Sequence, residues 1–321
     1  MVLSFGSINM DLVVQCDRVP DAGETVWANA WFMNPGGKGA NQAVQAARLG
    51  AATAFIGCVG ADAFGRELAD RLHQEGIDRT GVRINEATSS GLAYILVERT
   101  GENRIVAVSG ANGSVGEIEI RTLERMLSPD SVLMLQCEVP FPVVLRAAHL
   151  ARQHGATVIL DPSPVPAIEF RAGIFADIDY VMPNEGEARA ITGQTDLQAA
   201  GRALLSLGAA SVIIKRGAKG ALTVGACGAR KIKAFSVPTV DTTAAGDSFQ
   251  GAFAAAVDRK AGVDEALLWA TAAGALTVTR QGAQQSMPDR FGLQRFLTEH
   301  AGALEHMLAP ANSSDRGEDE L

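Results

Sequence analysis

The sequence predicts a doubly wound α/β fold, in which helices cover both faces of a mostly parallel sheet. Three passages carry this prediction, because in each of them a helical pattern ends on glycine, alanine follows, and an apolar, β-rich run begins. Glycine just after the last turn is typical of a left-handed helix end, and an uninterrupted apolar run is typical of a strand buried on both faces. Repetition of this unit indicates parallel strands joined by right-handed crossovers.

These passages place the strands along the chain. Gly50-Ala51 precedes a predicted strand at 53–56, Gly155-Ala156 precedes one at 157–160, and Gly208-Ala209 precedes one at 211–215. Apolar runs predict further strands at 2–5, 132–137 and 180–182.

Two stretches, at about 12–32 and 90–109, differ from this pattern because they alternate between apolar and polar residues and contain turn signals. The second is expected to be a hairpin that joins 94–98 to 105–109. Both are read as small antiparallel insertions in one domain that spans 1–310. Such insertions can close over a site as a lid, and insertions that serve packing alone are equally compatible with the pattern.

Composition narrows the class of protein. The chain has 321 residues, of which 47% are hydrophobic and 20% charged, and its formal net charge is −8. These values are typical of a folded globular protein, and they argue against a nucleic-acid partner or a membrane surface. Four separated cysteines without a CxxC pair, and the absence of a leader or a long apolar run, predict a cytoplasmic protein. The acidic segment 311–321 is expected to be disordered.

Polar residues follow the predicted strands, and in open α/β sheets ligands bind beyond the carboxyl ends of the strands. Five such strand ends lie far apart in the sequence, which makes a shared site more probable than five unrelated helix caps. The segments are Gly6-Ser7-Ile8-Asn9-Met10-Asp11, Gln136-Cys137-Glu138, Asp161-Pro162-Ser163-Pro164, Pro183-Asn184-Glu185-Gly186-Glu187 and Arg216-Gly217-Ala218-Lys219-Gly220.

The segment Asp241-Thr242-Thr243-Ala244-Ala245-Gly246-Asp247 is the most informative motif, because it stands directly before an apolar helical run. Free amides and partial positive charge at a helix start favour a phosphate, and small residues let it approach. Asp247 would repel that phosphate, so removal of a proton from an attacking hydroxyl is a reason for its presence. An ordinary acidic helix cap is the alternative.

A second glycine-rich helix start, Gly36-Gly37-Lys38-Gly39-Ala40-Asn41-Gln42, lacks the spacing of a Walker A loop, and no GxGxxG occurs in the chain. Its Lys38 and Asn41 can donate to hydroxyl oxygens, and Asn9, Asp11 and Glu138 can accept from them, which suits a small polyhydroxy ligand. For Asn9 and Asp11 a simple turn is the alternative.

Asn184 and Glu187 are three residues apart at a predicted helix start. This spacing is typical of a capping box, and it is also compatible with a contact to phosphate or to the water shell of Mg²⁺.

Together these motifs resemble the ribokinase branch of the ribokinase/phosphofructokinase-B family of sugar kinases, over 6 to about 288. The Asp241–Asp247 motif is the most specific part of the match. Asn9 with Asp11 and the unbroken 36–42 run favour the ribokinase branch, and Thr279-Arg280-Gln281-Gly282-Ala283-Gln284 completes the resemblance.

The resemblance implies ATP-dependent phosphorylation of the primary 5-hydroxyl of ribose. It implies that Asp247 is the base and that the amides of Ala244, Ala245, Gly246 and Asp247 form an anion hole. Sugar-binding residues would be Asn9, Asp11, Gly37, Lys38, Asn41, Glu138 and Asp247. Residues that serve Mg²⁺ and ATP would be Asn184, Glu187, Lys215, Arg216, Gly217, Ala218, Lys219, Gly220, Gly246, Asp247 and Thr271.

By the same resemblance, a monovalent cation, K⁺, would lie beside the anion hole. Its ligands would come from Asp241, Thr243, Thr277, Arg280, Gly282 and Ser286. The β insertions would form the lid and pair two subunits into a homodimer.

Two segments depart from the branch. Asp161-Pro162-Ser163-Pro164 stands where Asn-Pro-Ala-Pro is more usual, and Lys215-Arg216-Gly217 stands where many members have Thr-Leu-Gly. Kinases for 2-deoxyribose, fructose or ketodeoxygluconate therefore remain alternatives. A non-catalytic sugar-binding regulator is disfavoured because Gly246 and Asp247 are both present. A nucleoside kinase is disfavoured because the acceptor motif is so polar.

Overall fold

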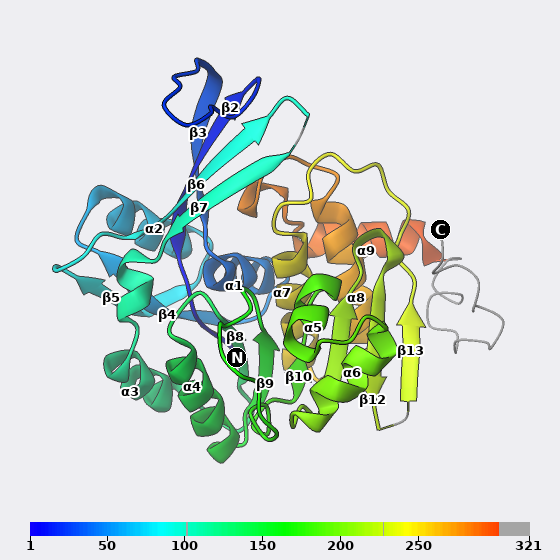
Figure 1. The fold of residues 1–321 in the computed structure, drawn as a ribbon. Coiled ribbons are helices and arrows are strands. Elements are labelled where there is room, and N and C mark those ends of the chain that lie inside the picture. Colours follow the sequence, from blue (N-terminus) through cyan, green and yellow to red (C-terminus); the bar gives the residue numbers. More distant parts are fainter. Residues whose placement is uncertain (101, 227, 302–321) are drawn as a thin grey trace.

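The computed structural model describes residues 1–100, 102–226 and 228–301. Its main sheet runs in the order β13-β12-β11-β10-β9-β8-β1-β4-β5 (Figure 1). Neighbouring strands are parallel from β11 to β5, and the pairs β11–β12 and β12–β13 are antiparallel. The bounds are β1 (Val2–Phe5), β4 (Thr53–Gly60), β5 (Asp78–Asn85), β8 (Val132–Gln136), β9 (Thr157–Asp161), β10 (Tyr180–Val181), β11 (Ser211–Lys215), β12 (Ala221–Gly225) and β13 (Gly228–Ile232).

The predicted fold class and all six predicted strands are confirmed, whereas β5, β12 and β13 were not predicted. The glycines that were expected to end helices have left-handed backbones, with φ of 91° at Gly50, 76° at Gly155 and 113° at Gly208. A residue with a Cβ adopts that conformation only at a cost, so these glycines set where each helix stops and its strand begins.

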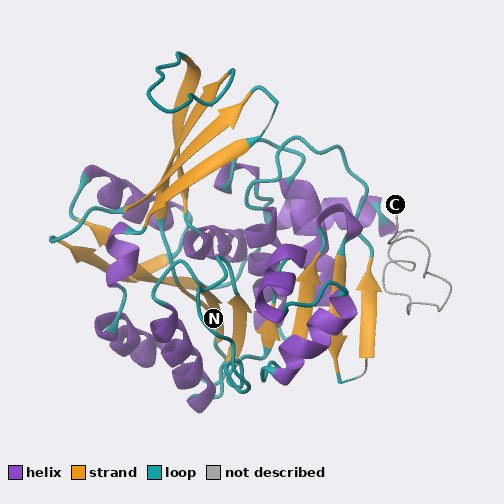
Figure 2. Ribbon diagram, viewed as in Figure 1, coloured by secondary structure: helices purple, strands orange, loops and turns teal. Residues whose placement is uncertain are grey.

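Helices cover both faces of the sheet (Figure 2). Adjacent strand residues point to opposite faces: Leu133 packs in one buried apolar cluster with α3–α6, and Met134 packs in another with α7–α9. The helices are α1 (Lys38–Arg48), α2 (Ala63–Gln74), α3 (Glu117–Met126), α4 (Phe141–Gln153), α5 (Glu185–Thr192), α6 (Leu197–Ser206), α7 (Ala245–Asp258), α8 (Val263–Thr277) and α9 (Arg290–Glu299). Three short 3₁₀ turns are η1 (Gly110–Ser114), η2 (Gly217–Lys219) and η3 (Gln284–Ser286).

The two insertions form a second sheet in the order β3-β2-β6-β7, which projects from the body of the molecule (Figure 1). Its strands are β2 (Asn9–Cys16), β3 (Ala28–Gly36), β6 (Gly91–Glu98) and β7 (Asn103–Val108). The predicted hairpin is the antiparallel pair β6–β7. β2 and β3 are also antiparallel, whereas the central pair β2–β6 runs parallel.

Within the described residues, no helix is both long enough and apolar enough to span a bilayer. Cys16, Cys58 and Cys137 carry free thiols. Cys227 and the acidic segment 311–321 lie outside the described residues.

Candidate active site

Asp247 lies in the first turn of α7, at the centre of a polar network. The helix follows Ala244, whose φ of 58° and ψ of 12° are left-handed. A left-handed residue before a helical one turns successive amide N–H groups toward one point, which is a common anion-binding geometry. A loop of this shape can hold an anion, and here it forms although position 244 carries a side chain.

The Asp247 carboxylate is held by two amides from α1. Asn41 Nδ2 donates to Asp247 Oδ2 over 2.9 Å, and Gln42 Nε2 donates to Oδ1 over 3.2 Å. Asp247 is only 6% exposed. Because both partners are neutral donors, the carboxylate is oriented without being neutralised, and it keeps lone pairs for a further donor.

Several predicted sugar-binding residues interact with this carboxylate: Asn41 bonds to it, and Asp11 and Lys38 interact with its charge. The Lys38 backbone N–H donates to Glu138 Oε2 over 3.1 Å. Asn9 Oδ1 accepts from Asn112 Nδ2 over 2.7 Å, and Asn112 is itself buried and bonded to the backbone of Ile8. Gly37 has φ of 85°, and a Cβ there would lie 2.7 Å from the Asn9 backbone nitrogen. Only glycine therefore lets the backbone segments around Gly37 and Asn9 approach this closely.

Charges in this part of the site influence one another. Burial, and then the neighbouring Glu138 and Asp247, raise the pKa of Asp11 from 3.8 to about 7. Burial alone would lower the pKa of Lys38, but Asp247, Asp161 and Glu138 outweigh it and raise that pKa. Lys38 is thus a permanent cation among carboxylates.

A cavity of about 640 Å³ opens beside Asp247. Lys38 and Asp247 line it, so two of the predicted sugar-binding residues also belong to the cavity wall. Other predicted nucleotide residues in its wall are Asn184, Glu187, Lys215, Gly217, Ala218, Gly220, Gly246 and Thr271. Apolar side chains of Phe235, Val237, Ala275 and Val278 form part of the same wall, which suits a flat base.

Two predicted nucleotide residues are placed elsewhere. Arg216 Nε donates to Glu185 Oε1 over 3.0 Å, and neither Arg216 nor the exposed Lys219 lines the cavity. Asn184 and Glu187 form the full capping box of α5, with reciprocal bonds of 2.8 and 2.7 Å. They line the cavity as well, so the capping interpretation and the ligand interpretation are compatible.

Among the residues expected to surround a monovalent cation, Asp241, Thr243 and Gly282 are joined by hydrogen bonds. Asp241 accepts from Thr243 N–H at 2.9 Å, Thr243 Oγ1 at 2.6 Å and Gly282 N–H at 2.9 Å. Burial would raise the pKa of Asp241, but these hydrogen bonds outweigh it and lower that pKa. The Thr277 and Ser286 hydroxyls donate to Ala273 and Ala283 carbonyls.

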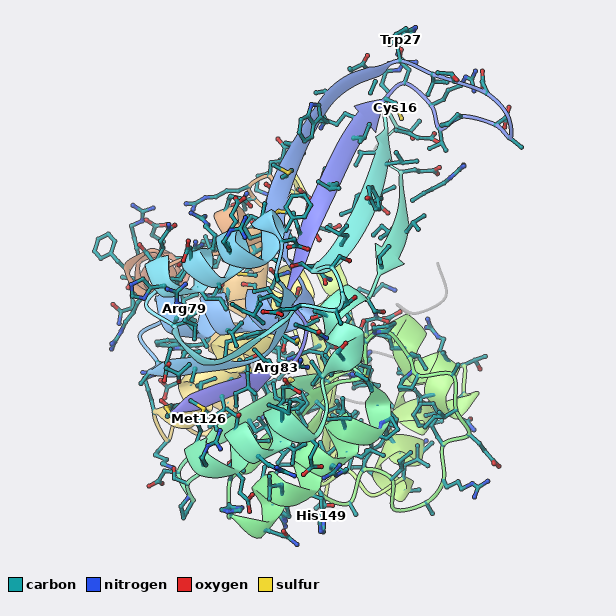
Figure 3. All side chains as sticks on the ribbon, turned by 90° about the vertical axis from the view of Figure 1, so that its left-hand side faces the viewer. Cys16, Trp27, Arg79, Arg83, Met126 and His149 are labelled. Carbon is teal, nitrogen blue, oxygen red and sulfur yellow. The ribbon has the colours of Figure 1, made fainter. Side chains whose placement is uncertain are left out.

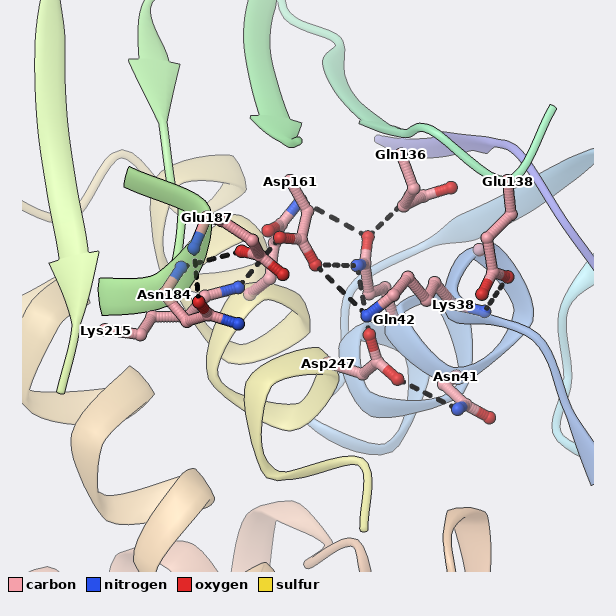
Figure 4. A network of polar contacts seen from close by, with 12 residues as sticks. Lys38, Asn41, Gln42, Gln136, Glu138, Asp161, Asn184, Glu187, Lys215 and Asp247 are labelled. Atoms are coloured by element: carbon pink, nitrogen blue, oxygen red, sulfur yellow. Dashed lines mark hydrogen bonds and ion pairs between the residues drawn. The ribbon is translucent and has the colours of Figure 1, made fainter. Parts of the chain in front are cut away.

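Three residues of the network were missed as site residues. Asp161, 1% exposed, accepts from Lys215 Nζ over 2.9 Å and lies 3.8 Å from Lys38 Nζ. Gln42 bridges Asp161 and Asp247 (Figure 4). Both stand in motifs that the sequence singled out, so strand-end position was an available signal. Asn112 stands in no motif that would have identified it.

The comparisons with known proteins agree with this geometry. The model of the pfkB family of carbohydrate kinases matches residues 1–290. The chain belongs to the pfkB family of carbohydrate kinases. Among curated members of the family, a ribokinase of Haemophilus influenzae is 40% identical over 92% of this chain and 97% of its own length. A deoxyribokinase of Salmonella typhi is 34% identical over 88% of this chain and 94% of its own length.

Solved structures of family members match equally broadly. A Thermotoga maritima ribokinase superposes with a TM-score of 0.85 at 38% identity, covering 92% of this chain and 99% of its own. An Arabidopsis thaliana ribokinase, solved with ribose and ATP, gives 0.83 at 31% identity, covering 92% and 98%. An Escherichia coli protein described as a putative ribokinase II, solved with ATP and Mg²⁺, gives 0.78 at 25% identity, covering 93% and 99%.

Proposed function

We propose that this protein transfers the γ-phosphoryl group of ATP to the 5-hydroxyl of D-ribose. The observation that carries the proposal is the position of Asp247. Its buried carboxylate stands at the start of α7, bonded to Asn41 and lining the nucleotide-sized cavity. A hydroxyl held by the sugar-binding residues and a phosphoryl group in the cavity would therefore both meet Asp247.

In the proposed reaction the sugar oxygen forms a bond to the γ-phosphorus while the bond to the β,γ-bridging oxygen breaks, and ADP leaves with the electron pair. Asp247 takes the hydroxyl proton. The amides at the start of α7 stabilise charge on the transferring group. Asn41 and Gln42 hold the carboxylate in place, so the chain supplies orientation and electrostatics rather than a covalent intermediate.

We further propose that Mg²⁺ enters with ATP. The described residues contain no cluster of three or more His, Cys, Asp or Glu side chains that could hold a metal. Mg²⁺ that keeps its waters and binds phosphate oxygens needs no such cluster. When bound, it would neutralise phosphate charge, and Asn184 and Glu187, which line the cavity, would contact its shell.

A K⁺ ion is proposed beside the Asp241 loop. The fit rests on donor type: the Asp241 carboxylate has a lowered pKa, the Thr243 hydroxyl lies 2.6 Å from it, and hard oxygen donors suit such an ion. When bound, the ion would add positive charge near the anion hole.

A homodimer is proposed through the projecting sheet. Large apolar side chains on one face of that sheet are exposed, among them Trp31 at 67%, Tyr94 at 44% and Val106 at 64%. Trp27, 92% exposed, lies at its far tip (Figure 3). An exposed apolar sheet face is typical of an interaction surface, and closure of the same sheet over the sugar would exclude water.

The test is turnover of the purified protein with ATP and Mg²⁺ on ribose, 2-deoxyribose, fructose, ketodeoxygluconate and adenosine, in K⁺ and in Na⁺ buffers. Preference for ribose with activation by K⁺ supports the proposal. Preference for 2-deoxyribose would move the substrate assignment toward the deoxyribokinase relative. Sugar binding without turnover on any acceptor would contradict a kinase function.

A further inference from the structure

Asp161 and Lys215 form a largely buried ion pair beside the cavity that Asp247 lines. Lys215 Nζ donates to Asp161 Oδ1 over 2.9 Å, and the two side chains are 13% and 1% exposed. Lys215 is fixed at its backbone, since its N–H donates to the Pro183 carbonyl over 2.8 Å. Its side chain also lines the cavity. The ammonium group therefore has a defined position and is largely shielded from solvent.

That position is beside the expected anion hole. A Cβ added at Gly246 would lie 3.6 Å from Lys215 Nζ. The start of a helix carries partial positive charge, so an ammonium group there is unfavourable unless negative charge lies close by. Asp161 supplies that charge here, and a phosphoryl group between Lys215 and the amides of α7 would supply it during the reaction.

Asp161 has other partners that would remain if Lys215 turned away. Its Oδ2 lies 3.8 Å from Lys38 Nζ and accepts from Gln42 Nε2 over 3.4 Å (Figure 4). One carboxylate thus faces two ammonium groups and an amide. If Lys215 bound a phosphoryl oxygen instead, the Asp161 carboxylate would still have these partners. Breaking the ion pair would therefore avoid the usual cost, an unpaired buried charge.

We propose that Asp161 is a positioning residue that holds Lys215 beside the anion hole, and that Lys215 contacts the transferring phosphoryl group as its charge develops. This assignment rests on the proposed kinase function. Lys215 then acts as a catalytic residue in the transition state, and Asp161 acts only through it. Lys38 and Gln42 keep Asp161 paired while Lys215 is engaged.

The test compares Lys215→Met, Asp161→Asn and the double variant, with kcat and KM for ATP and for sugar measured in each. Lys215→Met is expected to lower kcat by about 10²-fold with KM for ATP little changed, as for loss of one transition-state donor. Asp161→Asn is expected to lower kcat by about tenfold through misplacement of Lys215. The double variant is expected to equal Lys215→Met, because Asp161 has no effect without the lysine.

Lys215→Met can lose stability because it removes one of the two ammonium groups that face the Asp161 carboxylate. The double variant replaces the pair with neutral groups, so the kcat ratio between it and Asp161→Asn then measures the lysine alone. The matched control is Asp130→Asn with Lys260→Met, the same change at an exposed ion pair of 2.7 Å. The control is expected to keep wild-type kinetics.

Two results would overturn the assignment. If Lys215→Met raises KM for ATP and leaves kcat intact, the lysine binds only ground-state nucleotide. If the losses multiply in the double variant, Asp161 does not act through Lys215. Wild-type turnover on ribose tests the proposed function separately: if another sugar is the acceptor, the same kcat ratios taken with that sugar decide the roles of Lys215 and Asp161.

Discussion

Asn41 donates its side-chain N–H to Asp247 over 2.9 Å, and its amide oxygen accepts from Gln284 Nε2 over 3.1 Å. Asn41 therefore connects the proposed base to η3, at the end of the loop that follows α8. An amide suits this position because it can donate to one neighbour and accept from the other. Because the Asn41 amide is neutral, it orients the Asp247 carboxylate without adding a charge beside it.

Asn41→Asp tests this arrangement. A second carboxylate about 3 Å from Asp247 cannot ionise easily alongside it, so the pair would share a proton and its apparent pKa would rise. We expect kcat at pH 7 to fall and the acid limb of the pH–rate profile to move to higher pH. Asn41→Ser removes the bond without adding charge, so an equal shift in Asn41→Ser would contradict the explanation.

Asp247→Asn tests the base itself. Turnover is expected to fall by about 10²–10⁴-fold, the usual contribution of a positioned base. Sugar and ATP affinities, measured by calorimetry, are expected to persist. Asn41 and Gln42 both donate to this carboxylate, so the new amide group must face one of them with its own N–H. A modest loss of stability should accompany the variant. Near-normal turnover would remove Asp247 from the role of base.

Asp11 makes stability depend on pH. Its pKa is raised from 3.8 to about 7, so between these values the folded chain holds a proton that the unfolded chain releases. The stabilisation from this proton is complete below about pH 4 and is lost as pH rises through about 7. Asp11→Asn abolishes the effect. The denaturation midpoint of wild type should therefore fall relative to that of Asp11→Asn as pH rises from 5 to 8. A constant difference would show that Asp11 titrates normally.

Substitutions of Ala244 test the anion-hole geometry. Its left-handed backbone is strained for any residue with a Cβ and most for a β-branched one. Ala244→Gly is expected to keep activity and to unfold at the wild-type temperature or slightly above. Ala244→Val is expected to lose turnover more than ribose affinity, because the displaced amides serve the phosphoryl group. Equal kinetics in the two variants would show that the loop shape does not matter for transfer.

Much of the fold was predictable because its signals are local. The helix ends at Gly50, Gly155 and Gly208 require φ values that glycine adopts most readily, and the apolar runs that follow need no knowledge of distant residues. The parallel pairing of β2 with β6 was not predictable in this way, because alternation along a strand does not indicate the direction of a neighbour some 80 residues away.

The site residues also differ in how far local sequence signals could predict them. Asp247 and Asn41 stand in motifs whose chemistry is readable in sequence. Asp161 and Lys215 also stand in predicted strand-end segments, and both depart from the residues usual in the branch, yet only the fold shows that they are partners across 2.9 Å. Gln42 was visible as part of a glycine-rich run, whereas its bridge between Asp161 and Asp247 depends on how α1 packs beside α7.

The most direct test of the account is ³¹P NMR of a reaction that contains the protein, ribose, ATP and Mg²⁺, beside the same reaction with Asp247→Asn. Transfer to the 5-hydroxyl would give one new phosphate ester, coupled to the two C5 protons of ribose, which grows in step with ADP and is almost absent with the variant. An ester at another hydroxyl, or ADP and free phosphate without any ester, would contradict it.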